Sequence, residues 1–569
     1  MKRTKFLFFV IPTIILLSIF SLLFLKRFDT DAGTSDTFTT SVTVGNSAPV
    51  ITVAPAESTP SYAAAPTSPG TGITFNITAT DDNYDGYYLI VCKTNAVNAG
   101  ASGAAPTCAS APNTYCVSSS TTQNTQASCT HTTSSSNPWE NIWYAFVCDN
   151  NTAGSTCSTS QQGSGNSGSA FYVNHPPIFT STAGTLSANP GSSVTWTTVA
   201  NDTQDGNNIQ LLVCKTQAMS GGSCTGGAWC TSTAVLTNPT CSYSIPDPTP
   251  DGTVNAYVYV IDQFNVPAEG TNPQTTNKAY TVNNVAPVVS AVTINSGSAI
   301  TLEEAATKSI TVTATVTDKN SCNNPELTNG INAYVYRSGI TYATCLAGPT
   351  NANNCYSGIS CSVVAGSCTG IGDSAANYTC TINMEYYADP TDSDNIATSF
   401  SAQNWLASVK ATDDDAASHY ATSGGVEVNS LITVDCVEAG INYGNISAGS
   451  NSGTLNKTVQ NRATGNVPLD LTHCGTSMCT DYPTCSATGK TPIASTQQEF
   501  HTSSGISYGS GTDLPACASP VAVNINIDKV TTSTPTSKLT YWGVAIPLGT
   551  IPGTYSGLNT VTAVKNIAL

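Results

Sequence analysis

Charged residues are scarce in this chain. Only 9% of its 569 residues are charged, whereas an ordinary soluble domain carries roughly 25%. Basic residues are the scarcest: there are 18 Lys+Arg against 35 Asp+Glu, and five of the 18 lie in the first 27 positions. The rest of the chain therefore has 13 basic against 35 acidic residues, a formal balance of −22. An acidic body of this kind repels nucleic acid, so we expect no nucleic-acid partner.

Groups that commonly carry catalysis are also few. The five histidines are scattered, and no H-E-x-x-H sequence occurs. The G-x-S-x-G sequence at Gly505–Gly509 lies in a Ser/Gly-rich stretch, whereas a nucleophile elbow needs a strand turning into a helix. We therefore expect no enzyme and assign no catalytic residue. The alternative is a secreted carbohydrate-binding or polysaccharide-acting protein, because the paired carboxylates of a glycosidase meet only in the fold.

The one long apolar run lies at the N-terminus and carries no charge. Phe6–Leu25 is preceded by three basic residues and followed by two. A helix of this length crosses a bilayer core of about 30 Å, whereas a signal peptide usually has an apolar region of about 7–15 residues. Residues 1–30 are therefore predicted to be a membrane anchor, with a cleaved signal peptide as the alternative. In both cases the body is exported, either anchored at the cell envelope or secreted.

The exported body repeats itself. Three segments begin alike: Val44–Val50, Val173–Ile178 and Val282–Val288. An acidic turn followed by an apolar run that ends in Cys-Lys-Thr occurs twice, at Thr80–Thr94 and Asn201–Thr216. These landmarks predict a linker over 31–45, repeat 1 over 46–173, repeat 2 over 174–282, repeat 3 over 283–430 and a C-terminal domain over 431–569.

Strand-length runs of Val, Ile, Tyr and Thr alternate with Gly, Pro and Asn turns throughout the body. Helical periodicity is confined to a short candidate at Leu302–Lys308. The pattern predicts an all-β chain of tandem sandwiches after one N-terminal transmembrane helix. Residues 44–430 resemble the tandem immunoglobulin-like repeats of prokaryotic cell-surface and S-layer proteins, related in shape to PKD, cadherin-like and fibronectin type III domains. This resemblance implies a stalk, adhesin or surface-layer component.

The C-terminal domain has a different pattern. Ile441–Gly449, Thr458–Asn461 and Thr464–Leu471 resemble the strand and turn sequences of ASH/HYDIN-type immunoglobulin-like domains. The resemblance implies a fourth β-sandwich. Partners are expected to be the membrane, through the N-terminal helix, and a surface protein or glycan that the sequence does not identify. Self-association into a lattice is the further alternative.

Cysteines are distributed by repeat: six, four and six in the three repeats and five in the C-terminal domain. Even counts favour closed disulfide sets, and exported proteins favour disulfides. Sequential pairing is preferred, because Cys214–Cys224 and Cys230–Cys241 would each close a hairpin-sized loop. The disulfide candidates are Cys92, Cys108, Cys116, Cys129, Cys148, Cys157, Cys214, Cys224, Cys230, Cys241, Cys361, Cys368 and Cys380.

The odd count in the C-terminal domain leaves one thiol, for which Cys436 is the candidate. Zinc binding is the alternative interpretation of the cysteines. Zinc sites favour C-x-x-C pairs, and the chain has none. A zinc cluster can be drawn only at His473 with Cys474, Cys479 and Cys485.

Acidic turns offer the hard oxygen ligands that calcium prefers. The candidates are Asp82, Asp85, Asp202, Asp205, Asp413 and Asp415. The alternative is that these side chains only cap their own turns. A bound calcium ion would stiffen loops or inter-domain joints, and no other cofactor is expected.

N-glycosylation sequons lie at Asn76, Asn150, Asn201, Asn377, Asn445 and Asn456.

Overall fold

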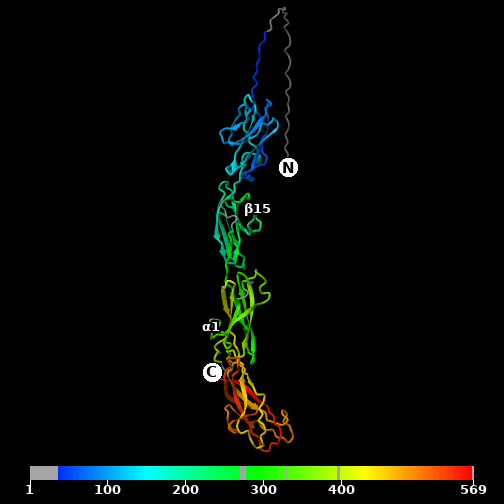
Figure 1. Cartoon of the computed structure of the whole chain (residues 1–569), viewed down its shortest axis with the longest axis vertical. Helices are drawn as coiled ribbons and strands as arrows, with labels where there is room; N and C mark the ends of the chain where they lie inside the picture. Colours follow the sequence, from blue (N-terminus) through cyan, green and yellow to red (C-terminus); the bar gives the residue numbers. More distant parts are fainter. Residues whose placement is uncertain (1–35, 270–276, 324, 328–329, 394–397, 567–569) are drawn as a thin grey trace, which may run out of the picture. The chain divides into compact units, whose positions relative to one another are not determined.

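The computed structural model describes residues 36–269, 277–323, 325–327, 330–393 and 398–566 (Figure 1). Strands dominate these residues, as the sequence predicts. The predicted N-terminal anchor lies outside the described residues. In the described part of the chain, no helix is both long and apolar enough to cross a membrane. The chain divides into two compact units: Met1–Ala63, Thr71–Thr133 and Asn141–Phe171 form the first, and Ala64–Gly70, Ser134–Glu140 and Tyr172–Leu569 form the second.

Repeat 1 is a two-sheet sandwich. One sheet has the order β1 (Val50–Glu57), β2 (Gly72–Thr80) and β7 (Gln126–Thr132), and the other has β6 (Thr114–Val117), β3 (Tyr87–Cys92) and β9 (Tyr144–Asp149). Two short strand pairs complete it: β4 (Val97–Asn98) with β5 (Thr107–Cys108), and β8 (Glu140–Asn141) with β10 (Phe171–Tyr172). Strands β1, β2 and β7 share one sheet, while β3 and β6, which lie between β2 and β7 in the sequence, form the other with β9, which follows β7; this is an immunoglobulin-like arrangement.

Repeat 2 has the same arrangement. Its first sheet has the order β11 (Ile178–Thr185), β13 (Ser193–Asn201) and β18 (Thr240–Ser244), and its second has β17 (Ala228–Thr231), β14 (Ile209–Cys214) and β20 (Tyr257–Asp262). A small sheet adds β12 (Ser187–Ala188), β21 (Tyr280–Val282) and β19 (Gly252–Val254), and β15 (Met219–Ser220) pairs with β16 (Ser223–Cys224).

Repeat 3 joins its two sheets into one. The order is β22 (Val288–Ile294), β23 (Thr307–Thr317), β26 (Ala375–Glu385), β25 (Cys355–Val363), β24 (Asn332–Arg337), β27 (Trp405–Thr412) and β28 (Ser418–Thr422). Strand β25 pairs with β24 through its first residues and with β26 through its last three, so it passes from one sheet to the other.

The short helix α1 spans Tyr342–Ala347. The expectation of a helix at Leu302–Lys308 was wrong, because this segment is coil and turn until strand β23 begins at Thr307. Within the turn, Ala305 has a φ of +49°, which a right-handed helix does not accommodate. The sequence of α1, in contrast, begins with a residue that favours a helix start. Its N-cap is Thr341, whose side chain accepts a hydrogen bond from the Thr344 N–H at 3.1 Å.

The C-terminal domain is a fourth sandwich. One sheet has the order β29 (Val434–Cys436), β30 (Lys457–Ala463), β35 (Ser537–Val544), β32 (Gln498–His501) and β33 (Thr512–Asp513). The other has β34 (Val521–Ile527), β31 (Leu469–Gly475) and β36 (Asn559–Lys565).

Each sandwich buries one tryptophan completely. Trp143, Trp196, Trp405 and Trp542 are at most 1% exposed. The strands around them alternate in the way a half-buried sheet requires. In β23, for example, Ile310, Val312, Ala314 and Val316 are buried and the threonines between them point away from the core.

The central strands of the repeats are apolar on both faces. In β14, Leu211 and Val213 enter the main core, whereas Leu212 and Cys214 belong to a second cluster on the opposite face. A loop closed by the Cys214–Cys224 disulfide packs on this second cluster. Because both faces are covered, the strand is a continuous apolar run in the sequence.

Equivalent outer clusters occur in the other repeats. The Cys92–Cys108 loop packs beside Ile90 and Phe146 in repeat 1, and the Cys345–Cys355 loop packs beside Tyr334 and Tyr336 in repeat 3. A second disulfide, Cys116–Cys129 or Cys230–Cys241, links the two sheets in repeats 1 and 2, and its counterpart in repeat 3, Cys361–Cys380, joins the paired strands β25 and β26. The remaining bonds are Cys148–Cys157, Cys322–Cys368, Cys474–Cys517 and Cys479–Cys485.

Candidate cation sites and inter-domain joints

Each repeat gathers one asparagine and two aspartates at the end of its sandwich. The asparagine precedes the first strand of the repeat and one aspartate follows its β2, β13 or β23. The other aspartate ends β9 or β20 or directly follows β27. We call these sets the end triads. They are Asn46, Asp81 and Asp149 in repeat 1, Asn174, Asp202 and Asp262 in repeat 2, and Asn284, Asp318 and Asp413 in repeat 3.

The triad of repeat 1 is only partly satisfied by hydrogen bonds. Asn46 Nδ2 donates to Asp149 Oδ2 at 2.8 Å, and Asp81 Oδ1 accepts from the Asn83 N–H at 2.7 Å. Asp81 Oδ2 is buried and has no hydrogen-bond partner. Burial raises the pKa of Asp81, and the charges of Asp85 and Asp149 raise it further, although backbone N–H groups act in the opposite direction.

The triad of repeat 2 buries its carboxylate more completely. Asn174 Nδ2 donates to Asp262 Oδ2 at 2.6 Å. Asp202 is 3% exposed, and neither of its oxygens has a hydrogen-bond partner. Burial, followed by the charge of Asp205, raises the pKa of Asp202 to about 6. Asp205 is itself engaged by the backbone N–H of His175 and by His175 Nδ1, the latter at 2.7 Å.

The triad of repeat 3 follows the same plan. Asn284 Nδ2 donates to Asp413 Oδ2 at 3.1 Å, and Asp318 Oδ1 accepts from the Asn320 N–H at 2.7 Å. Asp318 Oδ2 is buried without a hydrogen-bond partner. Burial raises the pKa of Asp318 to about 6, and the nearby charge of Asp413 contributes in the same direction.

The structure sorts the six predicted calcium ligands into three groups. Asp202 and Asp413 are triad members, and Asp85 and Asp205 lie beside a triad. Asp82 and Asp415 are exposed and lie outside the triads. Sequence reasoning missed Asp81 and Asp318, although each is the first residue after a strand that alternates buried and more exposed positions.

Repeats 2 and 3 meet in a joint that is rich in carboxylates, which we call the acidic joint. The Thr249 N–H donates to the Lys319 carbonyl at 3.1 Å, and Asn320 Nδ2 donates to the Thr249 carbonyl at 3.2 Å. Lys319 Nζ lies 3.4 Å from Asp247 Oδ2 in an exposed pair. Asp251, Glu326 and Asp414 lie in the same region.

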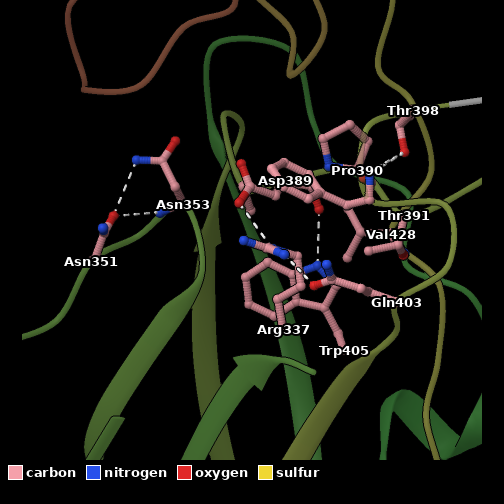
Figure 2. A network of polar contacts seen from close by, with 12 residues as sticks. Arg337, Asn351, Asn353, Asp389, Pro390, Thr391, Thr398, Gln403, Trp405 and Val428 are labelled. Carbon is pink, nitrogen blue, oxygen red and sulfur yellow. Dashed lines mark hydrogen bonds and ion pairs between the residues drawn. The ribbon is translucent and has the colours of Figure 1, made fainter. Parts of the chain in front are cut away.

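Repeat 3 and the C-terminal domain meet in a joint that carries its own counter-charges, which we call the compensated joint. Asp389 is 6% exposed and lies between two cations: Arg337 Nε is 3.1 Å from its Oδ2, and Lys529 Nζ is 3.2 Å from its Oδ1. Figure 2 shows Arg337 and Asp389 facing each other beside Trp405, whose Nε1 donates to the Asp389 carbonyl at 2.9 Å. Burial lowers the pKa of Lys529, and the charge of Asp389 opposes this shift.

Hydrogen bonds and apolar contacts extend the compensated joint. Lys529 Nζ also donates to Asn353 Oδ1 at 2.9 Å and to the Tyr387 carbonyl at 2.8 Å. Asn353 Nδ2 donates to the Thr531 carbonyl at 2.8 Å. Tyr386 and Tyr387, which follow the last residues of β26, are buried in the core of the C-terminal domain. The two domains thus share both a salt bridge and part of a core.

The zinc alternative is wrong for the C-terminal domain. Cys474 is bonded to Cys517 and Cys479 to Cys485, so these thiols are not available as thiolate ligands. His473 is fully buried between aromatic rings, 4.6 Å from the Phe500 centroid and 5.2 Å from the Trp542 centroid. Burial lowers the pKa of His473 to about 4. Cys436 is a free, half-buried thiol.

Cysteines of repeat 3 pair differently from those of repeat 2. The disulfide candidate Cys368 is bonded across 46 residues to Cys322, which is not among the candidates that the sequence gave. The disulfide equivalent to Cys214–Cys224 is Cys345–Cys355, for which the sequence offered no match. The structure also joins Cys214 to Cys224 and Cys230 to Cys241 in the sequential order that the sequence favours.

The sequon asparagines fall into two sets. Asn377, Asn445 and Asn456 are exposed. Asn76, Asn150 and Asn201 are half-buried, and their side chains take part in hydrogen bonds.

The G-x-S-x-G sequence at Gly505–Gly509 lies between β32 and β33, in turns and coil. No helix follows it in the described part of the C-terminal domain, so it does not have the strand-turn-helix geometry of a nucleophile elbow.

Comparisons with known proteins do not place the chain in a family. No family model and no curated protein matches it. Two solved chains titled "Marsupial T cell receptor" match along their full length and over 66% of this chain. Their sequence identities are 11% and 7%, and their TM-scores are 0.26 and 0.16. Likeness at this level carries no argument, so the immunoglobulin-like assignment rests on the strand order of repeats 1 and 2.

Proposed function

We propose that this protein is a non-catalytic surface protein that presents immunoglobulin-like modules outside the membrane as a stalk, adhesin or surface-layer component. The observation that carries the proposal is the repetition of one sandwich plan, with the same two disulfides, in three successive repeats. Each repeat has a disulfide that closes an outer loop, and a second disulfide that links the two sheets in repeats 1 and 2 and joins β25 to β26 in repeat 3. Repetition of a module suits a role in spacing and contact.

The disulfides support export. Ten bonds use 20 of the 21 cysteines. Such bonds persist in oxidising compartments and are rare in the cytosol. The predicted anchor at residues 1–30 would then hold the body at the cell envelope. The C-terminal domain, with its resemblance to ASH/HYDIN-type domains, would be the last of four exported modules.

The outer loops support a role in contact. Each disulfide-closed loop packs on the outer apolar cluster of its repeat. The bond restricts the backbone conformations of the unbound loop. A loop of about ten residues closed in this way gains on the order of 3 kcal/mol from the bond, so it does not need a core of its own. A preordered loop loses less entropy when it binds a surface protein or a glycan.

Surface display of the full-length chain tests the proposal. Intact cells that express the chain should bind an antibody raised against the C-terminal domain, and external protease should remove that signal. A matched chain lacking residues 1–30 should give no signal on intact cells while remaining detectable after lysis. Detection of the full-length chain only after lysis would overturn the proposal.

A further inference from the structure

Three carboxylates converge at the acidic joint. Asp251 directly precedes β19 of repeat 2, Glu326 lies between β23 and β24 of repeat 3, and Asp414 follows β27. One oxygen from each residue lies within 4.8 Å of the other two. Glu326 is 3% exposed, and its Oε2 is buried without a hydrogen-bond partner. A buried carboxylate oxygen in this state is costly unless a cation pairs with it.

The neighbouring charges make the arrangement more costly. Burial raises the pKa of Glu326 to about 8, and the charges of Asp251, Asp414 and Asp318 act in the same direction. Burial likewise raises the pKa of Asp251, followed by the charges of Asp415 and Asp414. The lysine of this joint, Lys319, pairs with Asp247. The closeness of the three acidic groups therefore favours a proton on Glu326 near neutral pH, and a cation that binds there would displace this proton.

We propose that Asp251, Glu326 and Asp414 bind one calcium ion that ties repeat 2 to repeat 3. Oxygens bound to one calcium ion at about 2.4 Å lie at most about 4.8 Å apart, which matches the separation of these three groups. The ligand set contains only oxygen, which suits a hard cation and disfavours zinc. Asp414 is exposed, so water can supply the remaining ligands that calcium needs and the protein does not provide.

The ion would act as a cross-link. Asp251 belongs to repeat 2, whereas Glu326 and Asp414 belong to repeat 3, so binding holds ligands from both modules at once. The site differs from the end triads, whose members all come from a single repeat. The inference does not depend on a surface role for the protein, since it concerns only the coupling of two neighbouring sandwiches.

Calorimetric titration of calcium into the full-length, EDTA-treated chain tests the site. The variant Asp414→Asn is the best probe, because its side chain is exposed and the substitution leaves the buried core unchanged. Asp251→Asn is the second probe, from the other repeat. Asp247→Asn is the matched control: it lies in the same joint but pairs with Lys319 instead of joining the three carboxylates.

We expect both probe variants to bind one calcium ion fewer than the wild type, or to bind that ion at least tenfold more loosely, whereas the control keeps the wild-type number. Ions bound at the end triads would remain in all three variants and so would not obscure the loss. The proposal is overturned if the wild type binds no calcium, or if Asp414→Asn and Asp251→Asn bind it with unchanged number and affinity.

Discussion

The two joints of the second compact unit solve the same electrostatic problem in different ways. At the compensated joint, one buried carboxylate, Asp389, meets two cations, Arg337 and Lys529. At the acidic joint, Asp251, Glu326 and Asp414 converge while the lysine of that joint pairs elsewhere. The first joint is complete as folded, whereas the second holds three carboxyl groups together and needs a proton on Glu326 or a bound cation to offset their charge.

This difference shows how one chain can combine permanent and conditional connections. A buried carboxylate costs several kcal/mol when it has no counter-charge, so the sequence must supply a cation or leave one to be bound. Lys529 comes from the C-terminal domain, so the counter-charge at the compensated joint arrives by folding. At the acidic joint the counter-charge would depend on calcium in the surroundings.

The largest effect is expected from Asp389→Ala. The substitution leaves Arg337 and Lys529 largely buried, at 11% and 12% side-chain exposure, without their shared counter-ion. Removing one partner of a buried ion pair typically costs about 3–5 kcal/mol. Denaturant unfolding of the full chain should show this loss in the transition that reports repeat 3 and the C-terminal domain.

The control for this substitution is Asp435→Ala, whose partner Arg462 is about 41% exposed. Exposed pairs contribute about 0–1 kcal/mol, so the control should change little. Equal losses in the two variants would show that the compensated joint gains nothing from burial of its charges.

A smaller effect is expected from removing calcium. At a free concentration about 100 times its Kd, a bound ion stabilises the folded state by about 2.7 kcal/mol. Differential scanning calorimetry should therefore show a lower melting transition for repeats 2 and 3 in EDTA than in calcium. The difference should shrink in Asp414→Asn, and a difference of the same size in that variant would assign the effect to ions bound elsewhere.

The calcium-free acidic joint should weaken as pH rises, and Glu326→Gln should remove that dependence. The pKa of Glu326 is raised to about 8 in the folded state, so its contribution to stability is complete below its ordinary pKa of about 4.5 and is lost as pH rises through about 8. In EDTA, the melting temperature of the wild type should therefore fall relative to the variant between about pH 5 and pH 8. A constant gap across this range would contradict the prediction.

The smallest effect is expected from Lys319→Ala. Lys319 and Asp247 are 57% and 38% exposed, so their pair should contribute less than about 1 kcal/mol to folding. Removing the cation makes the joint more negative, so calcium should bind slightly more tightly. Titration calorimetry compares the calcium affinity of the variant with that of the wild type. Weaker calcium binding in the variant would contradict this prediction.

The sequence predicts the sandwiches better than it predicts the sites. Alternating strands such as β23 and the apolar run of β14 are visible in the residue pattern, because burial on one or both faces of a sheet dictates them. The disulfide of repeat 3 between Cys345 and Cys355 was missed, because Tyr336 stands where the other repeats have a cysteine and the bond lies instead in the loop that carries α1.

The ligands of the proposed calcium site could not be predicted from local sequence. Acidic turns pointed to calcium, but Asp251 and Glu326 are single carboxylates in ordinary loops, and only folding brings them to Asp414. The residues of an inter-domain site are far apart in sequence, so local spacing carries no signal for them. Asp389 shows the same limit, since its partner Lys529 lies 140 residues further along the chain.

Hydrogen exchange with mass spectrometry on the full-length chain, with calcium and with EDTA, compares the two joints most directly. Calcium should slow exchange in peptides covering residues 247–252 and 412–416 of the acidic joint, and leave peptides covering 386–392 and 528–533 of the compensated joint unchanged. Unchanged exchange at the acidic joint, or equal slowing at both joints, would contradict the account.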